Sequence, residues 1–306
     1  MNNKNTLYGY LMGIGAVFFW SFNVIIARYL VGVLSPVQIS FGRWFFAALF
    51  LLPFTAKIML RDKELIAAHF KLIFAQSMTG VVLMNLLVYY AGQTTSAINM
   101  SLLGTVGPIF LVVFSALLLH TKVSMKQTAG FAAALLGVLT IITRGNLFNL
   151  EKFTFVVGDL WMLAMTVMFG LYGVLQTKKI EGLSSISQLS AVITVAVVVF
   201  LPFFLLSLAV NPPTHISGTV WMILIYMGVL PSLFSFFCWN GALDRLGSLK
   251  TSLIYYLMPV FSTIEAYFFL EEKISEPQVY GGILVVIGVF IAAYHRPTHP
   301  VPVTRI

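Results

Sequence analysis

The 306-residue sequence has few charged side chains, and this scarcity decides its class. Charged residues make up 9% of the chain, hydrophobic residues make up 59%, and the mean hydropathy is +0.95. A water-soluble domain carries about 25% charged residues, so this chain has too few of them to cover a globule in water. The composition therefore indicates an integral membrane protein that acts within the bilayer.

Residues for metal, cofactor or covalent chemistry are also scarce. The single Cys238 excludes an internal disulfide and a cysteine metal cluster. The chain lacks a Gly-x-x-x-x-Gly-Lys-Ser/Thr phosphate loop, which excludes an ATPase of that type. Its five histidines fall at expected helix ends or in loops, away from any metal or Ser-His cluster, at positions 69, 120, 215, 295 and 299. We therefore expect no metal, no cofactor and no enzyme activity.

Long apolar runs fill most of the chain. A transmembrane helix needs about 20 mainly apolar residues, and the runs show no alternation of the kind that marks barrel strands. The first run is longer than a signal peptide and is not followed by a small-residue cleavage site, so we count it as a helix. The sequence predicts ten spans, at residues 8–30, 36–55, 72–91, 95–119, 125–143, 155–177, 187–209, 218–241, 249–270 and 276–294.

The net charge of +8 follows the expected topology. With the N-terminus in the cytoplasm, the inner side carries Lys4, Lys57, Arg61, Lys63, Lys71, Lys122, Lys126, Lys178, Lys179, Arg245, Lys250, Arg296 and Arg305. The outer side carries only Arg28, Arg144, Lys152 and Lys273. This positive-inside bias predicts that both termini are cytoplasmic. Basicity is explained by topology, and we expect no nucleic-acid partner.

The two halves of the chain repeat one another. At an offset of 151 residues, the segment from Gly107 matches the segment from Met258 in a proline, two glycines, a lysine and several apolar residues. Leu52-Pro53-Phe54 likewise matches Leu201-Pro202-Phe203 at an offset of 149. The sequence therefore predicts two repeats of five helices each, at residues 7–144 and 155–295.

The predicted repeats have opposite orientations, because five spans are an odd number. The charges agree, since residues 57–71 form a basic inner loop while the corresponding residues 208–218 contain no Lys or Arg. Inverted repeats allow two states that open one central site to opposite sides of the membrane. A structural membrane protein that arose by duplication is the alternative.

Several short motifs resemble the EamA-type drug/metabolite transporter superfamily. They are Phe19-Trp20-Ser21-Phe22-Asn23, Ser35-Pro36, Arg43 followed by Trp44-Phe45-Phe46-Ala47-Ala48, Gly158-Asp159-Leu160 and Glu272-Lys273-Ile274. The resemblance covers residues 7–295 and is greatest to bacterial exporters of aromatic and other amino acids. It implies an all-α integral membrane carrier of ten helices, with two inverted five-helix repeats around a central cavity. Copy one has His120-Thr121 where copy two has Glu271-Glu272, so we assign this acidic position no transport role.

Charged residues within the apolar runs are costly, and they therefore point to function. Arg43 and Glu265 lie at similar depths from the outer side. Either they form an ion pair, or one of them contacts a charged group of the substrate or a gate; a structural pair or a snorkelling arginine is the alternative. Asp159 opens the sixth span, where we expect it to cap the helix.

Two prolines occupy equivalent positions in the repeats. Pro108 and Pro259 fall near the middle of the fourth and ninth predicted spans. A proline inside a helix removes a hydrogen bond and bends the helix, so we expect matched kinks beside the central site. A packing irregularity is the competing interpretation.

Aromatic residues that neighbour amides are the best candidates for substrate contact. An aromatic wall with amide dipoles suits an amphiphilic zwitterion such as an apolar or aromatic amino acid. For residues near the helix ends, the interfacial aromatic belt is the alternative. The candidate substrate-binding residues are Trp20, Asn23, Asn85, Tyr89, Trp161, Tyr172, Trp239 and Tyr255.

These observations predict a secondary transporter of the bacterial inner membrane. We expect it to export amino acids by alternating access, as a monomer or a loose oligomer, with the small-molecule substrate and the lipid bilayer as its partners. The alternatives are export of other metabolites or of cationic drugs with proton antiport, and a passive channel or scramblase. Proton coupling and facilitation both fit the sequence.

Overall fold

The computed structural model describes residues 3–120, 124–146, 156–213, 216–255, 257–294 and 304–305. Within these ranges the chain is helical apart from two short strands, β1 (Lys178–Lys179) and β2 (Thr304–Arg305), which pair in parallel. Thr121, Lys122, Lys152, His215, His295, Arg296 and His299, on which parts of the sequence analysis rest, lie outside the described residues. The helices are α1 (Asn3–Tyr29), α2 (Pro36–Arg61), α3 (Lys63–Ala68), α4 (Phe70–Ser77), η1 (Met78–Leu83), α5 (Met84–Gly92), α6 (Ala97–Gly104), α7 (Gly107–Leu119), α8 (Met125–Ile142), α9 (Val157–Gln176), α10 (Ser185–Val210), α11 (Gly218–Val229), η3 (Leu230–Phe234), α12 (Ser235–Tyr255), α13 (Met258–Leu270) and α14 (Glu276–Tyr294).

The structure confirms an all-helical membrane fold. Among the described residues, seven helices are long and apolar enough to cross a membrane, and two more apolar helices are shorter, Thr128–Ile142 and Met258–Leu270. The seven are Asn5–Tyr29, Pro36–Arg61, Phe70–Gly92, Ala97–Leu119, Val157–Gln176, Ser185–Val210 and Gly218–Ala242. The expected count of ten spans stays a prediction.

Serine residues fix where the long helices begin. The Ser35 and Ser184 hydroxyls precede α2 and α10 and accept hydrogen bonds from backbone N–H groups three residues ahead. Ser96 and Ser217 cap α6 and α11 in the same way. Such caps satisfy N–H groups that the first helical turn leaves free, so the turns between helices are encoded locally.

Local irregularities recur at the repeat offset. The π-helical segments η1 and η3 interrupt corresponding stretches of the two halves. His120 and Glu271, 151 residues apart, end α7 and α13 in the left-handed conformation, with φ of 54° and 55°. Such strained or irregular backbone must be maintained by its surroundings, so the repeat extends from sequence to backbone geometry.

Both prolines lie where a helical span is interrupted, and their role as kinks beside a central site stays a prediction. Pro108 and Pro259 occupy the first turns of α7 and α13, each after a short break from the preceding helix. The first turn of a helix tolerates proline because N–H groups there have no acceptor within the helix, so the missing N–H costs nothing. The residue before a proline also disfavours the helical conformation, which favours an interruption at that point. The loop expected between residues 241 and 249 is absent. Helix α12 runs without a break from Ser235 to Tyr255, and this stretch contains no proline that would end it.

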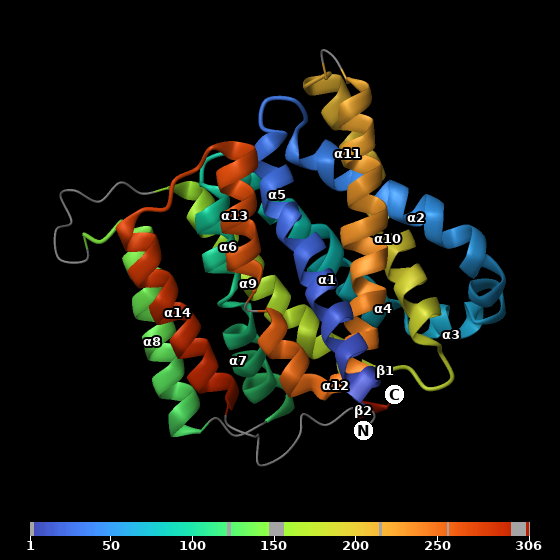
Figure 1. Cartoon of the computed structure of the whole chain (residues 1–306). Coiled ribbons are helices and arrows are strands. Elements are labelled where there is room, and N and C mark those ends of the chain that lie inside the picture. Colours follow the sequence, from blue (N-terminus) through green and yellow to red (C-terminus); the bar gives the residue numbers. More distant parts are fainter. Residues whose placement is uncertain are drawn as a thin grey trace.

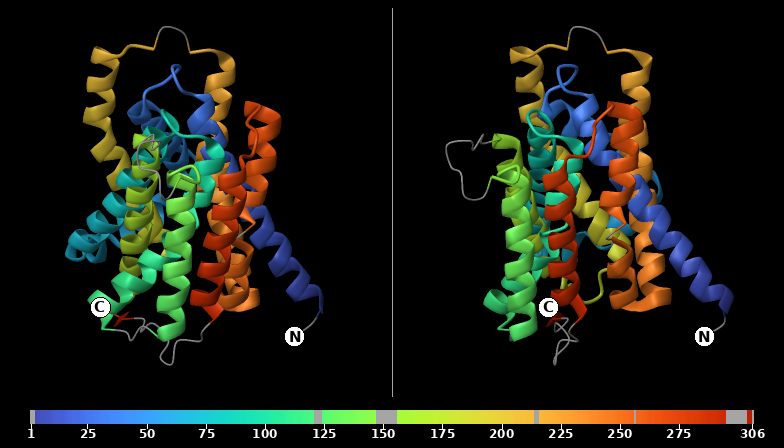
Figure 2. Two further views of the ribbon diagram at one scale, coloured as in Figure 1. Left: turned by 90° about the vertical axis from the view of Figure 1, so that its left-hand side faces the viewer. Right: turned by 60° about the vertical axis from the view of Figure 1, so that its left-hand side comes forward.

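The helices pack in pairs that involve both halves. α1 packs along α12 and α13, α2 packs along α10 and α11, and α5 and α7 pack along α9 (Figure 1). α8 and α14 lie side by side, green and red in Figure 2. Their backbones touch at glycines, since a Cβ on Gly137 would lie 2.5 Å from the Gly281 carbonyl oxygen. Small residues allow such close approach within a bilayer.

Candidate functional site

A buried arginine forms the centre of the candidate site. Arg43 of α2 is 5% exposed, and its Nη1 donates to the Asn23 Oδ1 at 2.6 Å, the Asn85 Oδ1 at 3.0 Å and the Tyr89 hydroxyl at 3.1 Å. Its Nε donates to the Ser232 hydroxyl at 2.7 Å. The structure thus brings together three predicted site residues around the predicted charge.

The ring around Arg43 is assembled from four helical segments, α1, α2, α5 and η3. Asn85 and Tyr89 lie one turn apart on α5, so both side chains reach the same guanidinium. Tyr89 also donates to the Asn23 Oδ1 at 2.8 Å, which links the ring members to one another. Ser232 donates to the Met227 carbonyl five residues earlier, a contact that the π-helical η3 makes possible. We refer to Asn23, Arg43, Asn85, Tyr89 and Ser232 as the arginine ring.

The charge of Arg43 has no anionic partner among the described residues. The ion pair within 4 Å in that part of the chain joins Arg61 to Asp62. Arg43 Nη2 makes no hydrogen bond to the described residues, and the guanidinium lies 5.1 Å from the Trp44 ring centroid, a cation–π distance. A cation buried in a membrane without a counter-ion is costly. The ring therefore offers free N–H groups and uncompensated positive charge to a ligand.

Aromatic side chains form a wall next to the arginine ring. The Trp20 ring lies 5.2 Å from Trp239 and 6.5 Å from Tyr255 between centroids. Phe169 stacks on Tyr255 at 6.3 Å and completes what we call the aromatic wall. Trp20 Nε1 donates to the Pro231 carbonyl at 2.8 Å, which fixes the indole. Trp20 lies one turn from Asn23 on α1, so the aromatic wall and the arginine ring are adjacent.

Glu265 does not pair with Arg43 in this structure. It is 4% exposed, and its Oε1 accepts a hydrogen bond from the Ser21 hydroxyl at 2.6 Å. Its Oε2 is buried without a hydrogen-bond partner, and so is the hydroxyl of Tyr226 on α11. The two expected intramembrane charges therefore lie in separate hydrogen-bonded groups, each of which contacts α1.

Two candidate substrate residues lie outside this arrangement. Trp161 is 40% exposed and its ring lies 5.9 Å from Tyr90, near the start of α9. This placement matches the interfacial aromatic belt. Tyr172 packs on Gly80 of η1 and its hydroxyl is hydrogen-bonded to Gln176. Neither side chain belongs to the ring or to the wall.

The acidic residue expected to cap α9 has another role. Val156 is the N-cap and makes no side-chain capping bond, whereas Asp159 Oδ1 accepts hydrogen bonds from Thr95 Oγ1 and Asn99 Nδ2. The capping prediction is wrong, because hydroxyl and amide donors of the preceding repeat compete for this carboxylate. A neighbouring acidic residue, Glu272, accepts the N–H groups of Ala97 and Ile98 at 3.0 and 3.2 Å and so caps α6.

A polar pocket opens above these contacts at the end where α6, α9 and α14 begin. Its volume is about 320 Å³. It is lined by Thr94, Thr95, Ser96, Asn99, Ile141, Arg144, Val156, Lys273, Ser275, Pro277 and Gln278. The pocket lies between segments of both halves, at the end of the molecule that the charge bias predicts to be outside.

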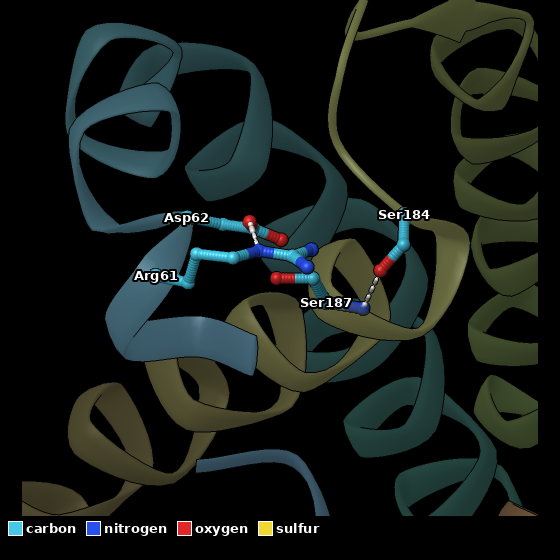
Figure 3. A network of polar contacts seen from close by, with 4 residues as sticks. All are labelled: Arg61, Asp62, Ser184 and Ser187. Atoms are coloured by element: carbon cyan, nitrogen blue, oxygen red, sulfur yellow. Dashed lines mark hydrogen bonds and ion pairs between the residues drawn. The ribbon is translucent and has the colours of Figure 1, made fainter. Parts of the chain in front are cut away.

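The opposite ends of α2 and α10 carry related contacts. Asp62 follows α2 and lies beside Ser187 in the first turn of α10, where the Ser184 hydroxyl caps the helix (Figure 3). Asp62 accepts a hydrogen bond from Arg61 Nε at 2.9 Å, and this contact holds the pKa of its carboxyl below the usual range. At the other end, Gln38 of α2 donates to the carbonyl of Asn211, which follows α10, at 2.9 Å. Asp62 and Asn211 are separated by the repeat offset of 149.

Sequence reasoning missed four contributors to the site, namely Ser21, Phe169, Tyr226 and Ser232. Ser232 and Ser21 are single hydroxyls in apolar runs, and such residues usually bond their own helix. A partial signal existed for Phe169, because it lies at the offset of 149 from Trp20. The fold was needed to place these side chains beside the charged ones.

Comparisons with known proteins identify the family. The model of the EamA-like transporter family matches residues 7–143 and 156–294. The uncharacterized transporter YyaM of Bacillus subtilis (strain 168) is 27% identical over 290 residues, covering 93% of each chain. A probable terminal-alkyne amino-acid exporter of Streptantibioticus cattleyicolor is 28% identical over 217 residues, covering 70% of this chain and 69% of that protein. A solved crystal structure matches with a TM-score of 0.58 at 18% identity, covering 93% of this chain and 95% of the other. The chain therefore belongs to the EamA-like transporter family, and it is a multi-pass membrane transporter rather than an enzyme.

Proposed function

We propose that this protein exports amino acids, with apolar and aromatic ones preferred, across the bacterial inner membrane. The observation that carries the proposal is the uncompensated Arg43 within the arginine ring, next to the aromatic wall. A free carboxylate is the ligand group that a guanidinium with unused N–H groups recognises best. An apolar side chain on the same ligand fits a wall of aromatic rings.

The ring also suits the other half of a zwitterion. Asn23 and Asn85 present amide oxygens, and Tyr89 presents a hydroxyl, all of which accept hydrogen bonds from an ammonium group. No full negative charge is needed to hold the ammonium, because the carboxylate of the same molecule balances it. The site therefore favours a molecule that is neutral overall and apolar at one end.

Alternating access is the mechanism that we propose. Its basis is a ten-span architecture with two inverted repeats, at residues 7–144 and 155–295, around a central cavity. The matched π-segments and left-handed helix ends support the repeat. In Figure 1, α1 begins at the end where N is marked and α9 begins at the opposite end, which supports the inversion. The positive-inside bias supports cytoplasmic termini.

The printed name of one relative agrees with this substrate class. The protein of Streptantibioticus cattleyicolor is named a probable terminal-alkyne amino-acid exporter. A cationic drug is a less suitable substrate, because the positive charge of Arg43 repels it. A passive channel or scramblase would not show exchange that saturates.

The test is counterflow in proteoliposomes that contain the purified protein. Vesicles loaded with unlabelled L-phenylalanine are diluted into a trace of the labelled compound, and transient uptake above equilibrium marks a carrier. We expect L-phenylalanine to compete for uptake, whereas its amide, which lacks the carboxylate, competes poorly. Equal competition by the amide would refute recognition through Arg43.

A pair of variants of α2 sharpens the result. Arg43→Gln keeps a polar side chain of similar length but removes the charge, and we expect counterflow of L-phenylalanine to be lost. Lys57→Gln removes a charge from an exposed position of the same helix and should leave counterflow unchanged. If Arg43→Gln transports like the unaltered protein, the proposed site is wrong.

A further inference from the structure

Two buried polar atoms near the site lack partners. Glu265 Oε2 and the Tyr226 hydroxyl are both buried and make no hydrogen bond to the described part of the chain. Glu265 is held from its other side, where the Ser21 hydroxyl donates to Oε1. Buried polar atoms without partners are rare in native proteins and often mark functional groups.

Among the described residues, the surroundings of Glu265 offer a negative charge one neutral hydrogen-bond donor, Ser21, and no cation within 4 Å. α13 packs against α1 and α6. The described part of α6 contains no titratable residue, and the group that α1 turns toward Glu265 is the neutral Ser21. From α11, the neutral phenol of Tyr226 lies within reach of the charges of both Glu265 and Arg43. No described basic group lies within 4 Å of the carboxylate. A bare carboxylate in such a place is costly, and a bound proton removes the cost.

The helix α1 joins this carboxylate to the arginine ring. Trp20, Ser21 and Asn23 lie within one turn and contact, respectively, the aromatic wall, Glu265 and Arg43. A substrate that binds the ring and the wall therefore contacts the same turn of helix that holds the carboxylate. Movement of this turn alters both sites together.

We propose that Glu265 binds the coupling proton of this transporter, so that the protein is a proton antiporter rather than a facilitator. In this conformation Glu265 carries the proton. The Ser21 hydroxyl, which lies 2.6 Å from both Glu265 Oε1 and the Phe18 carbonyl, orients the carboxyl group. One proton enters the cell as one substrate molecule leaves, and the proton gradient is the only energy source needed. The antiport step rests on the proposed export of amino acids, whereas proton binding by Glu265 does not.

The first experiment detects the proton without any substrate. Infrared spectra of the purified protein in lipid vesicles at neutral pH report the C=O stretch of protonated carboxyl groups. We expect such a band in the unaltered protein and its loss in Glu265→Gln. Glu276→Gln, a change at an exposed position of α14, is the matched control and should keep the band. If the unaltered protein shows no such band, or if Glu265→Gln keeps the whole band, the proposal is overturned.

The second experiment detects coupling. A vesicle lumen one pH unit more acidic than the bath, with the membrane potential clamped at zero, drives about tenfold accumulation of substrate in the lumen when one proton leaves for each substrate molecule that enters. We expect the unaltered protein to accumulate labelled L-phenylalanine in this way. Glu265→Gln should lose accumulation while counterflow at equal pH remains measurable. Gradient-driven accumulation by Glu265→Gln overturns the proposal.

A second variant covers the case in which Glu265→Gln does not fold. Ser21→Ala removes the hydrogen bond to Oε1 and leaves the carboxyl group in place. We expect it to shift the infrared band and the pH dependence of counterflow together. An unchanged band and pH dependence in Ser21→Ala overturn the proposal as well. If the band is present but no amino acid moves, the proposed function fails and proton binding by Glu265 stands.

Discussion

Replacing Asn23 by Asp tests the arginine ring, because it should raise stability and weaken transport at once. Asn23 Oδ1 accepts hydrogen bonds from Arg43 Nη1 at 2.6 Å and from the Tyr89 hydroxyl at 2.8 Å. Aspartate has nearly the same shape and keeps both acceptor contacts. It adds the negative charge that the ring lacks, and so it takes the place that we assign to the substrate carboxylate.

The magnitude follows from the geometry. With charge centres about 4 Å apart, the attraction is about 4 kcal/mol at an effective dielectric constant of about 20. Desolvation of the new carboxylate cancels part of this gain, and a charged hydrogen bond contributes about 1.5–3 kcal/mol net. We therefore expect about 2 kcal/mol of added stability. The substrate loses the same partner, and since 1.4 kcal/mol is tenfold in affinity, its half-saturation concentration should rise about thirtyfold.

The assay pairs thermal unfolding of the purified protein with L-phenylalanine counterflow over a range of substrate concentrations. Asn240→Asp makes the same chemical change on α12, where the exposed side chain donates to the Phe236 carbonyl, and it should alter neither quantity. A stabilised Asn23→Asp variant with unchanged half-saturation would show that Arg43 is structural. A destabilised variant would show that the charge of Arg43 is already balanced by another group.

Three further changes test other parts of the structure. Trp20→Phe keeps a ring in the aromatic wall but removes the indole N–H bond to a backbone carbonyl, so unfolding should become easier by about 1 kcal/mol, measured by thermal denaturation. Gly288→Ala places a Cβ 2.4 Å from a backbone nitrogen of α8 and should lower the unfolding temperature, whereas Gly15→Ala, with nothing within 4 Å, should not. The Arg61 contact lowers the pKa of Asp62, so this group stabilises the fold above its unfolded pKa and loses that effect as the pH falls through its folded pKa. The unfolding temperature should therefore fall more steeply in acid for the unaltered protein than for Asp62→Asn; equal acid profiles would contradict this assignment.

The sequence was sufficient for the fold class because its signals are local. Apolar length predicts helices, and serine or proline at a turn predicts where the next helix begins, as Ser35 and Ser184 show. Pro108 and Pro259 lie where helical spans are interrupted, but the sequence alone does not distinguish a bend in one helix from the start of another. The π-helical segments had no recognisable signal, because an extra residue in a turn is selected by tertiary contacts.

The sequence predicted the charged and amide residues of the site, but it did not predict which of them contact one another. Arg43, Asn23, Asn85 and Tyr89 stood out because polar groups inside apolar runs are costly, and the structure brings them together. That Glu265 lies apart from Arg43 depends on how α13 packs against α1, which no spacing in the sequence encodes. Trp161 lies outside the arginine ring and the aromatic wall, and its role stays a prediction, since an aromatic residue at a helix end fits the interface as well as a binding site.

The repeat explains the scaffold but not the chemistry, because the charged residues occur in one copy each. At the repeat offsets, Arg43 corresponds to Val192 and Glu265 corresponds to Phe114. If the halves are inverted copies around one cavity, as we propose, a charge in both copies would place like charges close together, where they repel. A single arginine and a single carboxylate avoid this repulsion while the apolar equivalents keep the packing of the two halves similar. Under the proposed alternating access, duplication supplies the two conformations, and the charged residues that occur in only one copy, Arg43 and Glu265, supply the binding chemistry.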